Sequence, residues 1–310
     1  MRREYRFFIF GLFFFISLVH NSLYGISKLD NKPMPLRDSR GAPSEALIDF
    51  FEFCSTNSPK TWESILKIAK EWFVSIEDKK NGIWPSPCLK RSTHELYNIL
   101  SALHSTQVIP SYYATYDYAV ILGGTLTSMR SRLFFLKQEW DRGVRFKEIV
   151  FVTSDRVRSE ALEDQTLLLE PNFVGYIVSP AWSFEGFLPK NEKEIAEFVW
   201  SQMERPEEWE SEKMKVSFIE AKSKEGGKFS SRKDSLQAWL SMNPNPGKVL
   251  FVSSQPYIGL DNLVICREFY YTKFIFDTVG PGFSMSFLNT ERGLGVCCEA
   301  IANWVYNFKK

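Results

Sequence analysis

The stretch that decides the fold is Tyr118-Ala-Val-Ile-Leu-Gly-Gly-Thr-Leu-Thr-Ser-Met-Arg130. Its first half is an unbroken apolar run, which is typical of a strand buried on both faces of a sheet. Gly123 and Gly124 then break the strand, and apolar residues at helical spacing follow from Met129 to Trp140. In an open α/β sheet, such a strand–turn–helix unit usually holds a small anionic group at the start of the helix.

Strands and helices alternate through the rest of the chain. The predicted strands are 118–122, 147–153, 215–219, 248–253 and 273–278, and the predicted helices are 126–142, 192–204, 232–242, 258–269 and 291–307. A further short strand is expected at 174–178. Strands joined by helices run parallel through right-handed crossovers. Residues 111–310 are therefore predicted to form a Rossmann-like three-layer α/β/α domain with a mostly parallel sheet of about five strands.

The N-terminal part has a different character. Residues 1–25 combine arginines at positions 2, 3 and 6 with an uncharged apolar run from Phe7 to Val19. A membrane span needs about 20 residues, so this shorter run predicts an export signal, with an uncleaved membrane anchor as the alternative. Residues 26–43 form a proline-containing linker. Residues 44–110 show helical spacing and predict an N-terminal helical appendage, whose aromatic side chains are expected to pack against the α/β domain.

Composition limits the classes of partner. The 38 basic and 37 acidic residues leave a net charge of +1, so no nucleic-acid partner is predicted. The three histidines lie in no ligand pattern, so no metal site is predicted either. The cysteines are Cys54, Cys88, Cys266, Cys297 and Cys298, with no CxxC pair, and the vicinal pair is expected to fill buried apolar space. No motif identifies a cofactor.

Polar residues follow four of the predicted strands. The carboxyl ends of parallel strands meet at one edge of the sheet, so these residues predict a single ligand site. The candidates are Gly123, Gly124, Thr125, Ser128 and Arg130 after the first strand, Ser154 and Asp155 after the second, Arg232 and Asp234 after the third, and Ser254, Gln255 and Tyr257 after the fourth. Glycines allow close approach to a ligand, and arginine pairs with phosphate or carboxylate. Arg132 competes with Arg130 for this role, and tight turns and helix caps would equally explain several of these residues.

The same segments carry a resemblance to a known family. They are Val120-Ile-Leu-Gly-Gly124, Arg130, Ile149-Val-Phe-Val-Thr-Ser154, Ser231-Arg-Lys-Asp-Ser-Leu-Gln-Ala238 and Val249-Leu-Phe-Val-Ser-Ser-Gln-Pro-Tyr257. Over about residues 115–280 the chain resembles the bacterial envelope family that includes SanA, ElyC and YdcF. The resemblance implies a Rossmann-like fold, an N-terminal membrane segment or signal, and a role in envelope barrier and peptidoglycan maintenance. One member is linked to S-adenosylmethionine. This chain has Gln255-Pro-Tyr257 near the position of a family histidine.

Together these features predict an exported or membrane-tethered protein of the periplasm or cell envelope. It is expected to bind a small anionic or nucleotide-like ligand at the strand ends and to act in envelope maintenance. The membrane would be a partner through the N-terminal segment if that segment stays uncleaved. Two alternatives remain open: a non-catalytic scaffold of the same fold, and a cytoplasm-facing S-adenosylmethionine-binding protein. Whether a reaction is catalysed is also left open by the residues.

Overall fold

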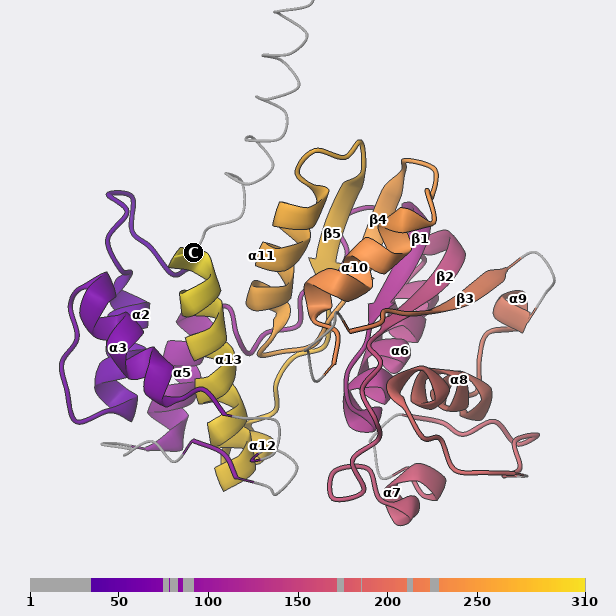
Figure 1. Ribbon diagram of the computed structural model, residues 1–310, viewed down its shortest axis with the longest axis horizontal. Coiled ribbons are helices and arrows are strands. Elements are labelled where there is room, and N and C mark those ends of the chain that lie inside the picture. The colour runs from indigo at the N-terminus through magenta and orange to yellow at the C-terminus, as the bar shows by residue number, and fades with distance from the viewer. Residues whose placement is uncertain are drawn as a thin grey trace, which may run out of the picture. The chain divides into compact units, whose positions relative to one another are not determined.

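Five parallel strands form a single sheet, as the sequence predicts (Figure 1). They are β1 (Thr115–Leu122), β2 (Arg145–Thr153), β3 (Lys215–Glu220), β4 (Lys248–Val252) and β5 (Ile275–Val279). Their order is β3-β2-β1-β4-β5, and Val120 in β1 lies between Val150 and Phe251 of its two neighbours. From β1 the chain adds β2 and β3 on one side of the sheet and then β4 and β5 on the other. The carboxyl ends of β1 and β4, between which this change of side occurs, are the topological switch point.

The computed structural model describes residues 35–74, 78, 83–85, 92–171, 176–184, 186–210, 214–223 and 229–309. The predicted signal or anchor at 1–25, the first half of the linker, Cys88 and the first two residues of the short strand expected at 174–178 lie outside these residues. The last three residues of that segment are described, and they contain an isolated bridge between Val178 and Met203 in place of a strand of the sheet. In the ranges just given, no helix combines the length and hydropathy that a membrane span requires.

Helices cover both faces of the sheet and complete the three layers. On one face, α6 (Leu126–Asp141) and α8 (Glu192–Gln202) pack against Ala119 and Ile121 of β1. On the other face, α10 (Arg232–Ser241) and α11 (Ile258–Phe269) pack against Val120 and Leu122. The alternation of side chains along β1 therefore serves two separate cores. Two short helices, α7 (Gln165–Leu169) and α9 (Glu207–Glu210), lie in the chain between β2 and β3.

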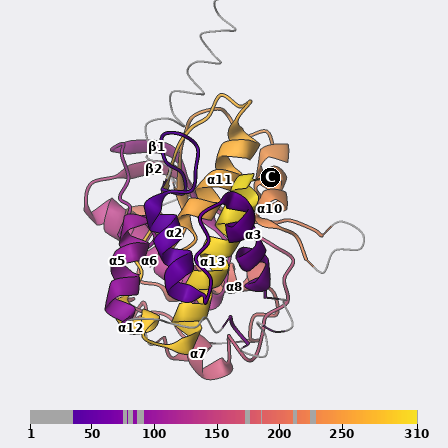
Figure 2. The same ribbon diagram turned by 90° about the vertical axis from the view of Figure 1, so that its left-hand side faces the viewer.

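Among the described residues, the predicted appendage contains the helices α2 (Glu45–Cys54), α3 (Trp62–Glu71) and α5 (Thr93–Ala102). They share one apolar cluster with the C-terminal α12 (Met285–Leu288) and α13 (Glu291–Lys309) (Figure 2). Cys54, Cys297 and Cys298 are buried, free thiols in this cluster. The sequence assigns the last helix to the α/β domain, but its apolar face belongs to the same cluster as the appendage helices. The appendage and the C-terminal helices therefore form one core.

The appendage leads into β1 through residues 103–114, called the connector here, which pass the carboxyl ends of β4 and β5. Ile109 and Gly280 exchange two backbone hydrogen bonds of 3.0 Å, and the N–H of Phe283 donates to the carbonyl of Thr106 at 2.8 Å. The connector therefore lies beside the loops that follow these two strands.

Candidate functional site

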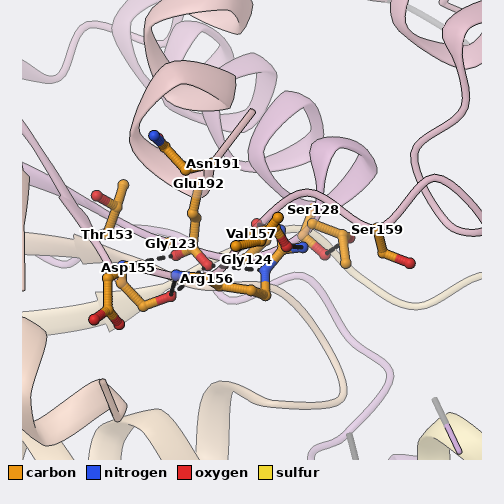
Figure 3. Close-up of polar contacts among 12 residues, drawn as sticks. Gly123, Gly124, Ser128, Thr153, Asp155, Arg156, Val157, Ser159, Asn191 and Glu192 are labelled. Atoms are coloured by element: carbon orange, nitrogen blue, oxygen red, sulfur yellow. Dashed lines mark hydrogen bonds and ion pairs between the residues drawn. The ribbon is translucent and has the colours of Figure 1, made fainter. Parts of the chain in front are cut away.

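The diglycine turn after β1 is covered by a carboxylate of the protein itself. Glu192, the first residue of α8, lies so close to Gly123 that a Cβ at this glycine would collide with Oε1 (Figure 3). The same carboxylate accepts hydrogen bonds from the Ser154 backbone N–H at 3.2 Å and from its hydroxyl at 2.8 Å. Glycine is thus required here by the approach of Glu192.

A second carboxylate occupies the start of α6. Glu163 is fully buried, and its Oε1 accepts a hydrogen bond from the Leu126 backbone N–H at 2.8 Å. The N-terminus of a helix attracts anions through its free N–H groups and its dipole. Glu163 therefore supplies, from within the chain, the negative group that the sequence predicts a ligand would bring.

Arg156 joins the two carboxylates. Its Nη1 and Nη2 each donate to Glu163 at 2.9 Å, and its Nε donates to Glu192 at 3.1 Å. Nη2 also donates to the carbonyl of Gly124 at 3.0 Å. Burial alone would lower the pKa of Arg156, but the two carboxylates outweigh it and raise the pKa. One guanidinium faces two carboxylates, so this corner of the site is unfavourable for a further anion.

Arg132 lies at the switch point between β1 and β4. Its Nη1 donates to the carbonyls of Leu122 and Gly123 at 2.6 Å each, and its Nε and Nη2 donate to Ser254 Oγ at 3.3 and 3.2 Å. The side chain is 2% exposed. Burial, followed by the nearby charge of Arg232, lowers the pKa of Arg132 to about 10. Throughout the described ranges, no carboxylate pairs with this guanidinium within 4.0 Å.

Arg232 approaches the same switch point from the first residue of α10. Its Nε donates to Asp261 at 3.0 Å, and the other oxygen of Asp261 accepts from the Ser253 hydroxyl at 2.6 Å. Within the part of the chain that the structure describes, the two terminal nitrogens of Arg232 have no hydrogen-bond partner. The switch point therefore holds two neighbouring guanidinium groups, of which only one has a carboxylate partner.

Arg130, which the sequence predicts as a ligand-binding arginine, points away from the switch point. Its guanidinium donates to Gln202 Oε1 at 3.1 and 2.6 Å and to the carbonyls of Leu167 and Leu168 at 2.6 and 2.7 Å. It also lies over the ring of Tyr176 at 5.5 Å. Arg130 thus links α6 to α8 and to α7.

Two further candidates, both acidic, bond to neighbouring backbone or side chains. Asp155 accepts from the N–H groups of Ser223 and Ser230 at 2.7 Å each, and these bonds lower its pKa despite the opposing effect of burial. Asp234 closes a capping box with Ser231 at the start of α10. These contacts give both acids a local structural role that needs no ligand.

The remaining candidates divide between the α6 turn and the end of β4. Thr125 and Ser128 share a hydroxyl contact of 3.1 Å. Tyr257 donates to Glu299 of α13 at 3.3 Å, and burial together with that carboxylate raises its pKa. Gln255 Nε2 donates to the connector carbonyls of His104 and Gln107 at 2.8 and 3.1 Å. Tyr257 therefore contacts α13, and Gln255 contacts the connector.

The structure brings Gly123, Ser154, Arg232 and Ser254 around Arg132 and Glu192, whereas Arg130 and Asp155 serve other contacts. Sequence reasoning misses Glu163 and Glu192 as site residues. Glu163 lies in an irregular stretch with no periodic signal, and Glu192 resembles an ordinary first-turn acid of a helix. A search for acids at the start of every helix that follows a strand end would have included Glu192.

No group of three or more histidine, cysteine, aspartate or glutamate side chains suited to a metal ion occurs in the described ranges. Comparison of the chain with protein-family models, curated proteins and solved structures finds no match.

Proposed function

We propose that this protein binds a small anionic ligand at the carboxyl ends of β1 and β4, with Arg132 and Arg232 as its anchors. The observation that carries the proposal is the burial of Arg132 without a carboxylate partner among the described residues. A buried charge is costly unless an opposite charge compensates it. The acceptors of Arg132 among the described residues are neutral oxygens. An anion from outside the chain would supply the negative charge that this guanidinium lacks.

The charges around the switch point favour this position over the diglycine turn. At the turn, Glu163 and Glu192 present two carboxylates against the single guanidinium of Arg156. Near Ser254, the guanidinium groups of Arg132 and Arg232 stand together, and among the described residues only Asp261 lies within ion-pair distance of either of them, with Glu192 acting on Arg132 from farther away. Like charges repel strongly where little water is present, so the anion belongs on the Arg132 and Arg232 side.

The expected location remains part of the proposal. The three arginines followed by the apolar run 7–19, and the resemblance to an envelope family, support an exported or membrane-tethered protein that acts in envelope maintenance. A reporter enzyme that is active only outside the cytoplasm, fused after Lys310, tests this. Activity of the fusion supports export, and its absence favours the cytoplasm-facing alternative.

Calorimetric titration of the full-length chain with inorganic phosphate and with citrate tests the binding proposal. Arg232→Gln removes one anchor from a partly exposed position, and we expect affinity to fall by about 10- to 100-fold, since charge-assisted hydrogen bonds contribute about 1.5–3 kcal/mol. The control is Arg267→Gln, because Arg267 is exposed and, among the described residues, donates only to the Asn307 carbonyl. Equal loss in both variants would contradict the proposal. Absence of binding by either anion would favour a scaffold.

A further inference from the structure

Two consecutive residues at the end of β4 have unused hydrogen-bonding capacity. Ser254 Oγ already accepts from Arg132, so its hydroxyl hydrogen is left to donate, and none of the described residues supplies an acceptor. Gln255 Oε1 is a buried oxygen without a donor in the described part of the chain. Ser254 and Gln255 are 8% and 6% exposed. Unpaired polar groups at this degree of burial are rare in folded proteins.

The orientation of the Gln255 amide is fixed by its surroundings. Nε2 donates to two carbonyl oxygens of the connector, those of His104 and Gln107. An amide turned over would place its oxygen against these carbonyls, so the nitrogen and oxygen cannot exchange without losing both bonds. The free atom is therefore an acceptor that can take a hydrogen bond from a bound molecule.

The hydrogen-bond donors at the switch point indicate which chemical group the other end of the bound molecule carries. The free nitrogens of Arg232, the guanidinium of Arg132 and the hydroxyl of Ser254 offer hydrogen bonds in several directions. A phosphate monoester has three terminal oxygens to accept them, whereas a carboxylate has two. The positive charges of both arginines disfavour an ammonium group close by, so the donor that meets Gln255 is best supplied by a neutral hydroxyl.

We infer that the ligand is a polyol or sugar phosphate, whose phosphate meets Arg132, Arg232 and Ser254 and whose nearby hydroxyl donates to Gln255 Oε1. This inference rests on the proposed anion site and adds the chemistry of the attached group. It distinguishes the ligand from a bare oxyanion and from a phosphate ester of a plain hydrocarbon.

Glycerol 3-phosphate and n-propyl phosphate are the matched probes, because they share the phosphate and the three-carbon chain and differ in the hydroxyls. We expect the full-length protein to bind glycerol 3-phosphate about 3- to 10-fold more tightly in calorimetric titrations, which is the range of one net hydrogen bond. Gln255→Met should bring the ratio of the two affinities close to one and leave n-propyl phosphate affinity within about twofold.

Gln107→Ala is the control for the structural role of Gln255, since it removes a side-chain contact of the connector to the Ser101 carbonyl and leaves Gln255 intact. Its affinity ratio should match the unmodified protein. Binding of both phosphates with equal affinity by the unmodified protein would overturn this inference and leave the anion site standing. Failure of both to bind would contradict the anion site itself. A ratio that persists in Gln255→Met would assign the hydroxyl to another residue.

Discussion

Glu163 caps α6 through a 2.8 Å hydrogen bond from the backbone N–H of Leu126. The start of the helix after the first strand is the position that open α/β folds most often give to a ligand phosphate. In this chain a buried carboxylate stands there, held in turn by Arg156. The ligand site is consequently expected one strand away, where Arg132 and Arg232 lie at the end of β4.

Arg156→Ala should destabilise the fold by about 3–5 kcal/mol, because it leaves the buried carboxylates of Glu163 and Glu192 without their common partner. Urea denaturation at pH 7 measures the loss. Lys147→Ala is the control, since the ion pair of Lys147 with Asp117 is largely exposed, and its loss should destabilise the protein far less than the loss of Arg156. Similar losses in the two variants would show that the buried network contributes no more than a surface pair.

The two glycines of the turn should differ in their tolerance of alanine. At Gly123 a Cβ would collide with Glu192 Oε1 and lie 2.9 Å from the Val152 carbonyl oxygen. At Gly124 the nearest atom is Arg132 Nη1 at 3.2 Å, and a small shift relieves that contact. We expect Gly123→Ala to lower the midpoint of thermal unfolding by several degrees more than Gly124→Ala. The reverse order would place Glu192 away from the turn.

Much of this architecture is predictable from the sequence, because apolar periodicity records burial directly. The apolar runs beginning at Ala119 and Val249 each mark a strand that the structure contains. Helix α11 even begins and ends at the predicted residues 258 and 269.

The arrangement of the site is harder to predict from the sequence, because it depends on the direction in which each side chain points. Arg130 and Arg132 are two residues apart on α6, so they point about 200° apart around the helix axis. One contacts α8 and the other the switch point. Nothing in their spacing identifies which faces the strands. The packing of α13 with the appendage is similarly hidden, because an amphipathic pattern shows that a face is buried and leaves the partner open.

Arg130→Met should destabilise the protein and leave anion binding intact. The variant removes hydrogen bonds to the buried Gln202 and to the Leu167 and Leu168 carbonyls, and we expect a loss of about 3 kcal/mol. Phosphate affinity measured at a temperature where the variant is folded should stay within about twofold. A tenfold loss would return Arg130 to the binding site.

Asp155 should make stability depend on pH in the acid range. Hydrogen bonds from Ser223 and Ser230 hold its folded-state pKa below the ordinary value of 3.8. Its contribution is therefore fully present above about pH 3.8 and declines as pH falls further. The difference in urea midpoint between the unmodified protein and Asp155→Asn should be larger at pH 7 than at pH 3. A difference that is constant or grows at low pH would contradict this assignment.

The most direct test of the account locates the anion itself. Crystals of the protein soaked in tungstate, a tetrahedral oxyanion with strong anomalous scattering, would show where the ion binds. We predict a peak with oxygens about 3 Å from nitrogens of both Arg132 and Arg232. Glu163 should still accept the hydrogen bond from the Leu126 backbone N–H. A peak at the start of α6 with Glu163 displaced, or no ordered ion at the end of β4, would contradict the central claim.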